Sequence, residues 1–435
     1  MNYSPAKTVI LFFLGLAIVG TALLSLPAAR NFSAFSFITN LFTAVSAVCV
    51  TGLSVVNIGE YYSTFGQIII LFLVQLGGMG YMFVSTVITL LFGKVALKDR
   101  RIMQDMFDIS SFSGLKRLLS KAIFFVLAIE FVGAVVLTFI FLGSFSSFSK
   151  SIYLGIFYSI TAFCNTGFSF FYDSLAGFAN NPFLLYVISA LVLLGRLGFF
   201  VIVDIYDTYK ENRLHLSTHT KVVLSVSAGI TFFAFILFLF SGTVRGHGIF
   251  YLINNAFFQA VSARTAGFYS IPVNLFNEFT EVMLLFLMSV GASPGSTAGG
   301  IKVTTLALVF VFVRSVLKGD DNFVLFKRCI TVDLVKKALI VFIIFFASIA
   351  FFSVILVLLE SYLNPLAVVF EVVSAFATVG LSLGITSDLS VGGKVLIIIA
   401  MIAGRIGILT LLIVALNPSA KKKNIKYPEA RILIG

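Results

Sequence analysis

A short stretch built around one glycine recurs four times along the chain. The stretches are 48–54, 163–169, 263–269 and 376–382, and in each a small or β-branched residue precedes the glycine and a Leu or Phe follows it. The glycines are Gly52, Gly167, Gly267 and Gly380, with spacings of 115, 100 and 113 residues. Spacing this regular indicates that one structural unit is used four times.

These stretches could present backbone carbonyl groups to a cation. Rings of carbonyl oxygens replace the hydration shell of potassium in selectivity filters, and glycine allows the positive φ that points neighbouring carbonyls the same way. A single glycine of this kind would be more typical of a helix C-cap, whereas four in register favour a pore. The predicted potassium-binding residues are Val50, Thr51, Gly52, Leu53, Asn165, Thr166, Gly167, Phe168, Thr265, Ala266, Gly267, Phe268, Thr378, Val379, Gly380 and Leu381.

The composition requires a lipid environment. Hydrophobic residues make up 59% of the chain and charged residues 11%, with a mean hydropathy of +1.09, whereas soluble domains carry roughly 45–50% apolar and about 25% charged residues. We therefore predict an all-α polytopic membrane protein without a large soluble domain. The three cysteines, Cys49, Cys164 and Cys329, have unrelated spacings that suggest neither a disulfide framework nor a metal cluster.

Eight stretches are long and apolar enough to cross a bilayer, which takes about 20 residues. They are 8–29, 64–92, 118–142, 181–206, 221–241, 279–313, 337–359 and 392–416. The first is longer than the roughly 7–15 residues of a signal-peptide core, so we interpret it as a membrane helix. Shorter, half-polar stretches near 34–50, 150–165, 249–264 and 364–378 lead into the glycine motifs and suit re-entrant pore helices.

The predicted unit is a span, a pore helix, a glycine motif and a second span. Four tandem units would then surround one pseudo-fourfold pore with eight transmembrane helices and four re-entrant helices. The predicted boundaries are 1–100, 101–212, 213–325 and 326–416, followed by a cytoplasmic C-terminal tail at 417–435.

The basic residues agree with this topology. Seven Lys and Arg lie between 93 and 121, three between 207 and 221, six between 314 and 337 and five after 417, which with Lys7 makes 22 of the 30. The positive-inside bias then places both termini in the cytoplasm of a multi-pass plasma-membrane protein. The net charge of +12 needs no nucleic-acid partner, since basic residues beside spans suit anionic lipid.

The second span of the third unit contains a segment that cannot form a regular helix. Residues 291–300 include four Gly, one Pro and three hydroxyl residues. Irregular backbone at membrane depth is tolerated where protein buries it or where it lines a watery cavity. We predict a mobile loop on the path of an ion leaving the filter, the alternative being close helix packing. The other second spans, with glycine patterns at 77–80, 195–198 and 404–407, are expected to be unbroken.

The chain resembles the Trk/Ktr/HKT superfamily of potassium transporters, and within it the Ktr-type membrane subunit. The likeness rests on 51–54, 165–169, 264–268, 295–302, 378–381, 404–407 and the tail motif 424–428, and covers essentially the whole chain. It implies a homodimer with one pore per subunit and regulation by a cytosolic RCK-type nucleotide-binding subunit. Some members depend on sodium. Gly52 matches the potassium-selective pattern, whereas relatives with Ser there tend to favour sodium.

The resemblance also implies that the broken segment is a gate. The gate residues would be Gly291, Ser293, Pro294, Gly295, Ser296, Thr297, Gly299, Gly300, Lys302 and Arg405. Arg405 lies in mid-span, where a charge costs roughly 2.5–3.5 kcal/mol and needs a partner. Its predicted role is a positive barrier below the filter, and the alternative is an arginine bound to carbonyls freed at a helix break.

Other charged residues are also predicted to lie at membrane depth, where an isolated charge is costly. Arg264 precedes the third motif and Glu371 lies on the fourth pore helix, so we predict that they pair and brace the filter. Arg196 is assigned equally to gating and packing, and Glu130 to packing rather than transport. The external acids Glu60, Asp173, Glu278 and Asp388 either concentrate cations at the mouth or are ordinary loop residues.

Two other function classes fit the sequence less well. A carrier with substrate bound at paired broken helices is disfavoured by the single predicted break, and a sodium-conducting relative is the other alternative. An enzyme is disfavoured because neither an HExxH metal motif nor a GxxxxGK[ST] nucleotide loop is present. The expected cargo is K⁺, with sodium dependence left open, and no organic cofactor is expected on this chain.

Overall fold

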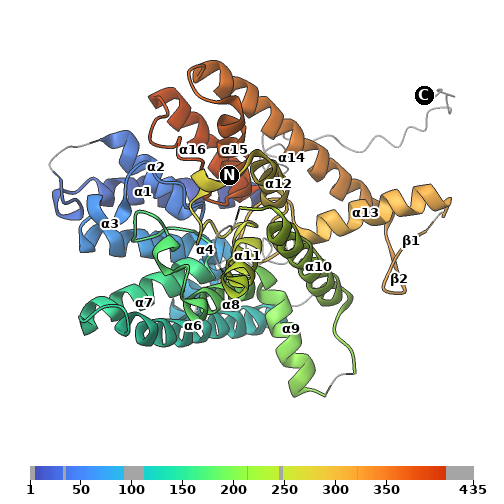
Figure 1. The fold of residues 1–435 in the computed structure, drawn as a ribbon. Helices are drawn as coiled ribbons and strands as arrows, with labels where there is room; N and C mark the ends of the chain where they lie inside the picture. The colour runs from blue at the N-terminus through green and yellow to red at the C-terminus, as the bar shows by residue number, and fades with distance from the viewer. Residues whose placement is uncertain are drawn as a thin grey trace.

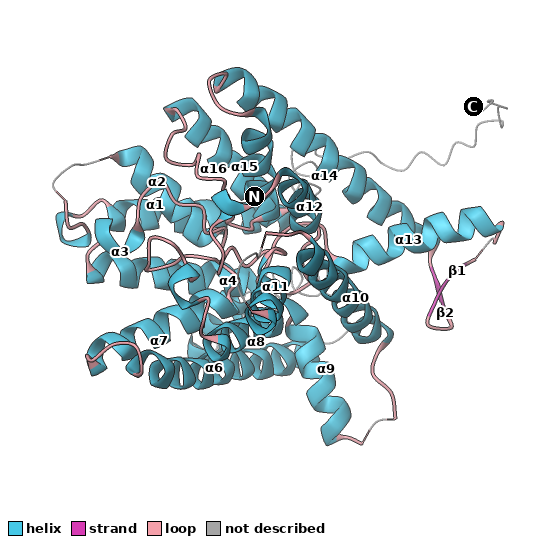
Figure 2. Ribbon diagram, viewed as in Figure 1, coloured by secondary structure: helices cyan, strands magenta, loops and turns pink. Residues whose placement is uncertain are grey.

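The part of the chain that the structure describes is an assembly of helices with one small hairpin (Figures 1 and 2). In this computed structural model, residues 5–32, 36–92, 112–212, 214–243, 248–320 and 322–407 are described. The predicted tail at 417–435 and most of the basic segment after residue 92 lie outside the described residues. The mostly helical architecture agrees with the predicted class.

The elements follow in chain order. They are α1 (Pro5–Leu24), η1 (Pro27–Ala29), α2 (Phe37–Val48), α3 (Ile58–Tyr61), α4 (Thr64–Phe92), α6 (Phe112–Leu142), α7 (Phe148–Phe163), η2 (Ala176–Phe178), α8 (Pro182–Leu197), α9 (Phe199–Lys210), α10 (Thr218–Phe240), α11 (Ile249–Ser262), η3 (Val273–Leu275), α12 (Glu278–Ser289), α13 (Val303–Lys318), β1 (Phe323–Leu325), β2 (Arg328–Ile330), α14 (Val332–Leu359), α15 (Pro365–Ala377) and α16 (Val391–Ile406). Antiparallel β1 and β2 pair Phe323 with Ile330. This hairpin lies at the periphery beside α13, and α13 packs against α10 and α14 (Figure 1).

Among the residues that the structure describes, four helices are long and apolar enough to cross a membrane. These segments are Lys7–Leu24, Leu118–Leu142, Thr218–Phe240 and Val332–Leu359, at the predicted first span of each unit. Between 22% and 33% of the residues in each are buried inside the protein. Most residues of these apolar helices are therefore not buried inside the protein, which leaves apolar surface of the kind that marks contact with lipid.

The predicted second spans are interrupted more often than the sequence suggested. Gly198 alone separates α8 from α9, and the two helices are bent by 92°. Gly80 has a non-helical conformation inside α4, and α12 and α13 are separate helices. The expectation of a single broken helix is therefore wrong. Glycines with φ of +73° and +81° at these two breaks adopt a conformation that other residues rarely take.

Four short helices, α2, α7, α11 and α15, lead into the glycine motifs. Each ends three to five residues before its glycine. Side chains of Ser36, Ser147 and Asn364 cap the start of α2, α7 and α15 by accepting a hydrogen bond from a backbone N–H of the first turn. Three of these four helices thus begin at a polar side chain that caps the first turn, and α11 begins after Gly248 without one.

The short helices also connect the chain into a closed series. Each contacts the helix that follows the preceding glycine motif: α4 contacts α7, α8 contacts α11, α12 contacts α15, and α16 contacts α2. The last contact joins the end of the described chain to its beginning. The two largest hydrophobic clusters surround this centre and include residues from all four short helices.

Candidate functional site

The four motif glycines, which are far apart in the sequence, lie side by side at the centre of the fold. A Cβ atom added to any of them would meet the carbonyl oxygen of the residue that precedes the next glycine. The four separations are 1.7 Å from Gly52 to Thr166, 2.6 Å from Gly167 to Ala266, 2.4 Å from Gly267 to Val379 and 2.2 Å from Gly380 to Thr51. The series closes on itself, so the motifs form a ring.

Positive φ angles recur at two positions in each motif of the ring. The four glycines have φ of +90°, +76°, +74° and +89°. Two residues earlier, a non-glycine residue also has positive φ in each motif: Val50 (57°), Asn165 (58°), Thr265 (102°) and Thr378 (50°). Three of these are β-branched, for which positive φ is uncommon and costs on the order of 1–3 kcal/mol. Such strain persists only where the surroundings enforce it, as at a functional site.

Serine hydroxyls hold two of the glycine amides from behind. The N–H of Gly52 donates to Ser46 Oγ at 3.0 Å, and the N–H of Gly380 donates to Ser374 Oγ at 3.1 Å. Both serines are buried and lie six residues before their glycine on a short helix. Sequence reasoning missed them, although the shared spacing of six residues was a signal that could have identified the pair.

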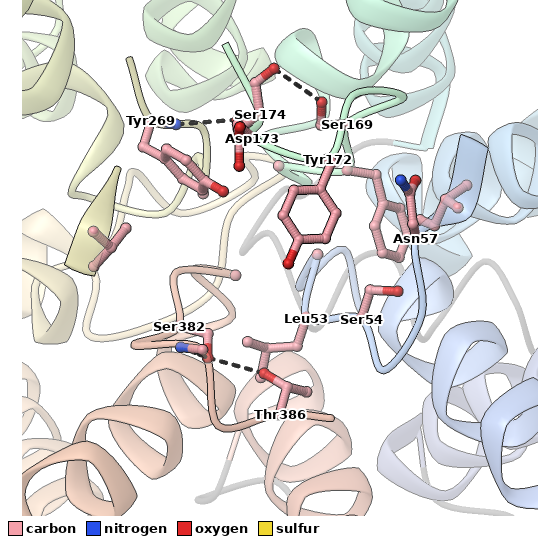
Figure 3. Close-up of a pocket in the computed structure, with 18 of the residues that line it drawn as sticks. Leu53, Ser54, Asn57, Ser169, Tyr172, Asp173, Ser174, Tyr269, Ser382 and Thr386 are labelled. Atoms are coloured by element: carbon pink, nitrogen blue, oxygen red, sulfur yellow. Dashed lines mark hydrogen bonds between the residues drawn. The ribbon is translucent and has the colours of Figure 1, made fainter. Parts of the chain in front are cut away.

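A cavity of about 650 Å³ opens on one side of the ring (Figure 3). All four glycines line it together with the segments that follow them. The Tyr269 N–H donates to Ser174 Oγ at 3.2 Å, which ties the third segment to the second. Burial, with a smaller effect of Asp173, raises the pKa of Tyr269 to about 12, so its hydroxyl is neutral at physiological pH.

Acidic residues contribute little to this mouth. Of the four external acids considered from the sequence, Asp173 lines the cavity, whereas Glu60, Glu278 and Asp388 are exposed residues outside its lining. Hydroxyl and carbonyl groups therefore provide most of its polarity, including the linked hydroxyls of Ser382 and Thr386, 2.9 Å apart.

On the opposite side, the segment between α12 and α13 folds back on itself. The N–H of Gly291 donates to the Ile301 carbonyl at 2.9 Å, and the N–H of Ile301 donates to the Ser289 carbonyl at 3.2 Å. Lys302 Nζ donates to the Ala298 carbonyl at 2.6 Å, which closes the C-terminal half of this segment. We call residues 290–302 the intramembrane loop. It is a hydrogen-bonded loop between two helices rather than a continuous helix.

The tip of the intramembrane loop sits against the break between α8 and α9. The N–H of Phe199 donates to the Gly295 carbonyl at 3.0 Å, and the N–H of Ser293 donates to the Arg196 carbonyl at 3.2 Å. Pro294 to Ser296 are half-buried, whereas Ser293 and Thr297 are buried. The bend at Gly198 therefore provides the seat of the loop.

Arg405 fastens the loop to a different helix. Its guanidinium donates to the carbonyls of Thr297 and Gly77, and to the Gly78 carbonyl at 3.1 Å. The charge is thus held by backbone carbonyls at interrupted helices, as the alternative sequence interpretation required. Because Thr297 belongs to the loop, the same contacts also tie α16 to the predicted gate.

The predicted pairing of Arg264 with Glu371 is wrong. Arg264 Nη1 donates to the Ser227 carbonyl and to Thr231 Oγ1, both at 3.2 Å, and Nη2 donates to the Gly291 carbonyl at 2.9 Å. Neutral oxygens of α10 and of the loop therefore bind its charge. Arg264 holds the start of the intramembrane loop rather than a carboxylate.

Glu371 instead supports the segment after Gly380. Its carboxyl oxygens accept hydrogen bonds from Ser382 Oγ at 2.7 Å and Thr386 Oγ1 at 2.5 Å. Both hydroxyls lie within six residues of the fourth glycine and line the mouth cavity. This contact braces one filter segment without an ion pair.

Two further buried charges lie beside the second motif. Glu130 accepts two hydrogen bonds from Gln75 Nε2, at 3.1 and 2.9 Å. Arg196 Nε donates to Asn165 Oδ1 at 3.1 Å. Glu130 is thus held by an interhelical contact, and Arg196 contacts a motif residue directly.

Comparison with known proteins identifies the family. The sequence profile of TrkH, described as a cation transport protein, matches residues 6–425. The chain belongs to the TrkH family. This assignment confirms the resemblance drawn from the motifs, and the family consists of transporters rather than enzymes.

Several TrkH-type relatives are similar over nearly their whole length. They are the potassium/sodium uptake protein NtpJ of Enterococcus hirae (35% identical, covering 99% of this chain and 97% of the relative), the Ktr system potassium uptake protein B of Vibrio alginolyticus (34%, 99% and 94%) and the Ktr system potassium uptake protein D of Bacillus subtilis (36%, 99% and 97%). The potassium transporter TrkH from Vibrio parahaemolyticus has a similar solved structure, with a TM-score of 0.76 and 19% identity over 95% of this chain and 85% of that one. The structural match supports the helical membrane fold.

Proposed function

We propose that this protein carries potassium into the cell across the plasma membrane, through a pore formed by four tandem units around the glycine ring. Each unit would contribute a span, a re-entrant helix, a glycine motif and a second span, within the boundaries 1–100, 101–212, 213–325 and 326–416. The termini would lie in the cytoplasm. Relatives named as potassium uptake proteins cover nearly the whole chain and support the cargo.

The observation that carries the proposal is the closed ring. The carbonyls of Thr51, Thr166, Ala266 and Val379 each lie beside the glycine of a neighbouring motif, with positive φ at both flanking positions. Carbonyl oxygens arranged in this way can replace the hydration shell of a bare potassium ion. The side chains before the glycines differ among the four motifs, so we propose fewer equivalent ion sites than in a symmetric tetrameric filter.

The intramembrane loop would be the gate. It lies between the ring and the bend at Gly198, and Arg405 and Lys302 close it with hydrogen bonds to its own carbonyls. A positive charge below a cation filter also opposes passage of the ion. Opening would then require the loop and Arg405 to separate.

The family resemblance supports further proposals about assembly and regulation. The protein would form a homodimer, bind a cytosolic RCK-type subunit and depend on sodium in the manner of some relatives. The name of the E. hirae relative includes both potassium and sodium, so sodium conduction is the second candidate function. It would predict uptake of both ions at similar rates.

Uptake in a transport-deficient bacterial host tests the proposal. The native protein should restore potassium uptake, with sodium uptake much slower. Gly52→Ser should lower the potassium-to-sodium ratio, because its side chain would meet the Thr166 carbonyl. A native protein that is expressed in the membrane but carries no potassium would refute the proposed function.

A further inference from the structure

We infer that the intramembrane loop and the filter ring form one hydrogen-bonded unit, in which the side chains of Thr378 and Asn165 are positioning residues that latch the loop to two separate filter segments. This inference rests on the proposed function, because it assigns a regulatory contact to the same pore. It gives both residues a role that is separate from the carbonyl groups they present to the ion.

The fourth glycine motif, residues 376–382, provides the first latch. Thr378 Oγ1 accepts a hydrogen bond from the N–H of Gly299 at 3.0 Å. A Cβ on Gly299 would lie 2.4 Å from the same oxygen, so the loop and the segment are in direct contact. Thr378 has positive φ and lies two residues before Gly380. A strained filter residue thus supplies the acceptor for a buried amide of the loop.

The second glycine motif, residues 163–169, provides the other latch. Asn165 Nδ2 donates to Thr297 Oγ1 at 3.1 Å, while its Oδ1 accepts from Arg196 Nε at 3.1 Å. Thr297 Oγ1 also lies 3.2 Å from the Phe163 carbonyl, the last residue of α7. Asn165 is the positive-φ residue two positions before Gly167, which is the same place that Thr378 occupies in the fourth motif.

The two latches join non-adjacent walls of the ring. The glycine contacts run from the first motif to the second, the third, the fourth and back to the first. The second and fourth segments are therefore opposite each other in the series. Loop residues 297–299 span the distance between them, so movement of the loop out of the pore must break both contacts.

Burial makes these contacts consequential. Asn165, Thr297 and Thr378 are all fully or almost fully buried, and Gly299 is buried as well. A buried donor that loses its acceptor is costly because no water replaces the bond. The closed loop thus stabilises the two segments, and the segments in turn hold the loop closed. A gate opening would loosen the filter on its inner side.

Hydrogen–deuterium exchange of the full-length purified protein tests the latch. Thr378→Val removes the acceptor but keeps the shape of the side chain, and Thr378→Ser keeps the hydroxyl. We expect exchange of a peptide covering 290–302 to become about tenfold faster in Thr378→Val, since each factor of ten corresponds to about 1.4 kcal/mol and a lost buried partner costs on this order. Thr378→Ser should remain within about twofold of the native rate.

A matched variant separates the latch from general loosening of the fourth segment. Thr386→Val removes a hydrogen bond to Glu371 on the mouth side of the same segment, away from the loop. It should leave exchange of the loop unchanged. Thr297→Val, made from the loop side, should accelerate loop exchange and lower the potassium-to-sodium uptake ratio together, whereas Thr297→Ser should change neither.

These experiments distinguish failure of the latch inference from failure of the proposed potassium uptake. Equal loop exchange in Thr378→Val and Thr378→Ser, or equal acceleration by Thr386→Val, would overturn the latch even if potassium uptake is normal. Failure of the native protein to carry potassium would overturn the proposed function, while the exchange measurements would still report whether the loop is bound to the ring.

Discussion

At the scale of single residues, the motif glycines are required because backbone atoms fill the space of a side chain. Gly267→Ala would place a methyl group 2.4 Å from the Val379 carbonyl at a φ of +74°. We expect potassium uptake to fall at least tenfold, because the ring cannot close around the added atom. Uptake per membrane-inserted protein is the measurement.

A glycine elsewhere in the chain provides the control. Gly229 lies in α10, and an added Cβ would have no neighbour within 4 Å. Gly229→Ala should keep native uptake and gain roughly 0.5–1 kcal/mol of helix stability. If both variants lost uptake equally, close approach of the ring carbonyls would not be the reason that Gly267 is needed.

Arg405 offers a second prediction at this scale, because its charge and its shape can be separated. Arg405→Ala removes both, and we expect the maximal rate of potassium uptake to rise. Arg405→Lys keeps the charge but lacks the planar fork that reaches the carbonyls of Thr297, Gly77 and Gly78 together. Its rate should lie between those of the native and alanine proteins. Slower uptake in Arg405→Ala at normal expression would contradict a barrier.

At the scale of elements, the bend between α8 and α9 determines where the loop sits. Gly198 has φ of 81° and ψ of 151°, a region open essentially to glycine alone. Its added Cβ would lie 2.9 Å from the Pro294 carbonyl. Gly198→Ala should therefore destabilise the folded protein by about 1–3 kcal/mol. A lower melting temperature in detergent would show this.

The matched variant for this element is Gly15→Ala in α1, where an added Cβ meets nothing within 4 Å. It should not lower the melting temperature. Equal melting temperatures for Gly198→Ala and the native protein would mean that the bend is not the constraint the backbone angles suggest.

Local sequence patterns predicted these elements where the cause was local. The short helices follow from apolar runs, and the four glycines follow from a residue type with a distinct backbone range. The bend at Gly198 was missed because the surrounding segment stays apolar on both sides, so composition gives no sign of a change in direction. Its signal was the final glycine of the pattern at 195–198, shared with Gly80.

Contacts between distant side chains could not be predicted in the same way. The cost of unpaired charges at membrane depth suggests that Arg264 pairs with Glu371. In the structure, Arg264 instead donates to a carbonyl of the intramembrane loop, and Glu371 accepts from a hydroxyl of the segment after Gly380. Likewise, positive φ at Val50, Thr265 and Thr378 runs against the preference of β-branched residues. Only the assembled ring imposes it.

At the scale of the whole molecule, the ring depends on all four glycine motifs, since each contacts the next and the contact of α16 with α2 closes the series. An ion bound by carbonyls from all four motifs would therefore oppose unfolding of the entire chain. A ligand that binds only the folded state stabilises it by about 2.7 kcal/mol at a hundred times its dissociation constant. We expect the melting temperature to rise with the logarithm of the potassium concentration, and to rise less in sodium.

Choline chloride at the same ionic strength should give no ion-specific shift, and Gly380→Ala should remove the potassium effect because its Cβ would lie 2.2 Å from the Thr51 carbonyl. Equal shifts in choline and potassium would mean that the stabilisation comes from ionic strength and that the four units are not joined by an ion.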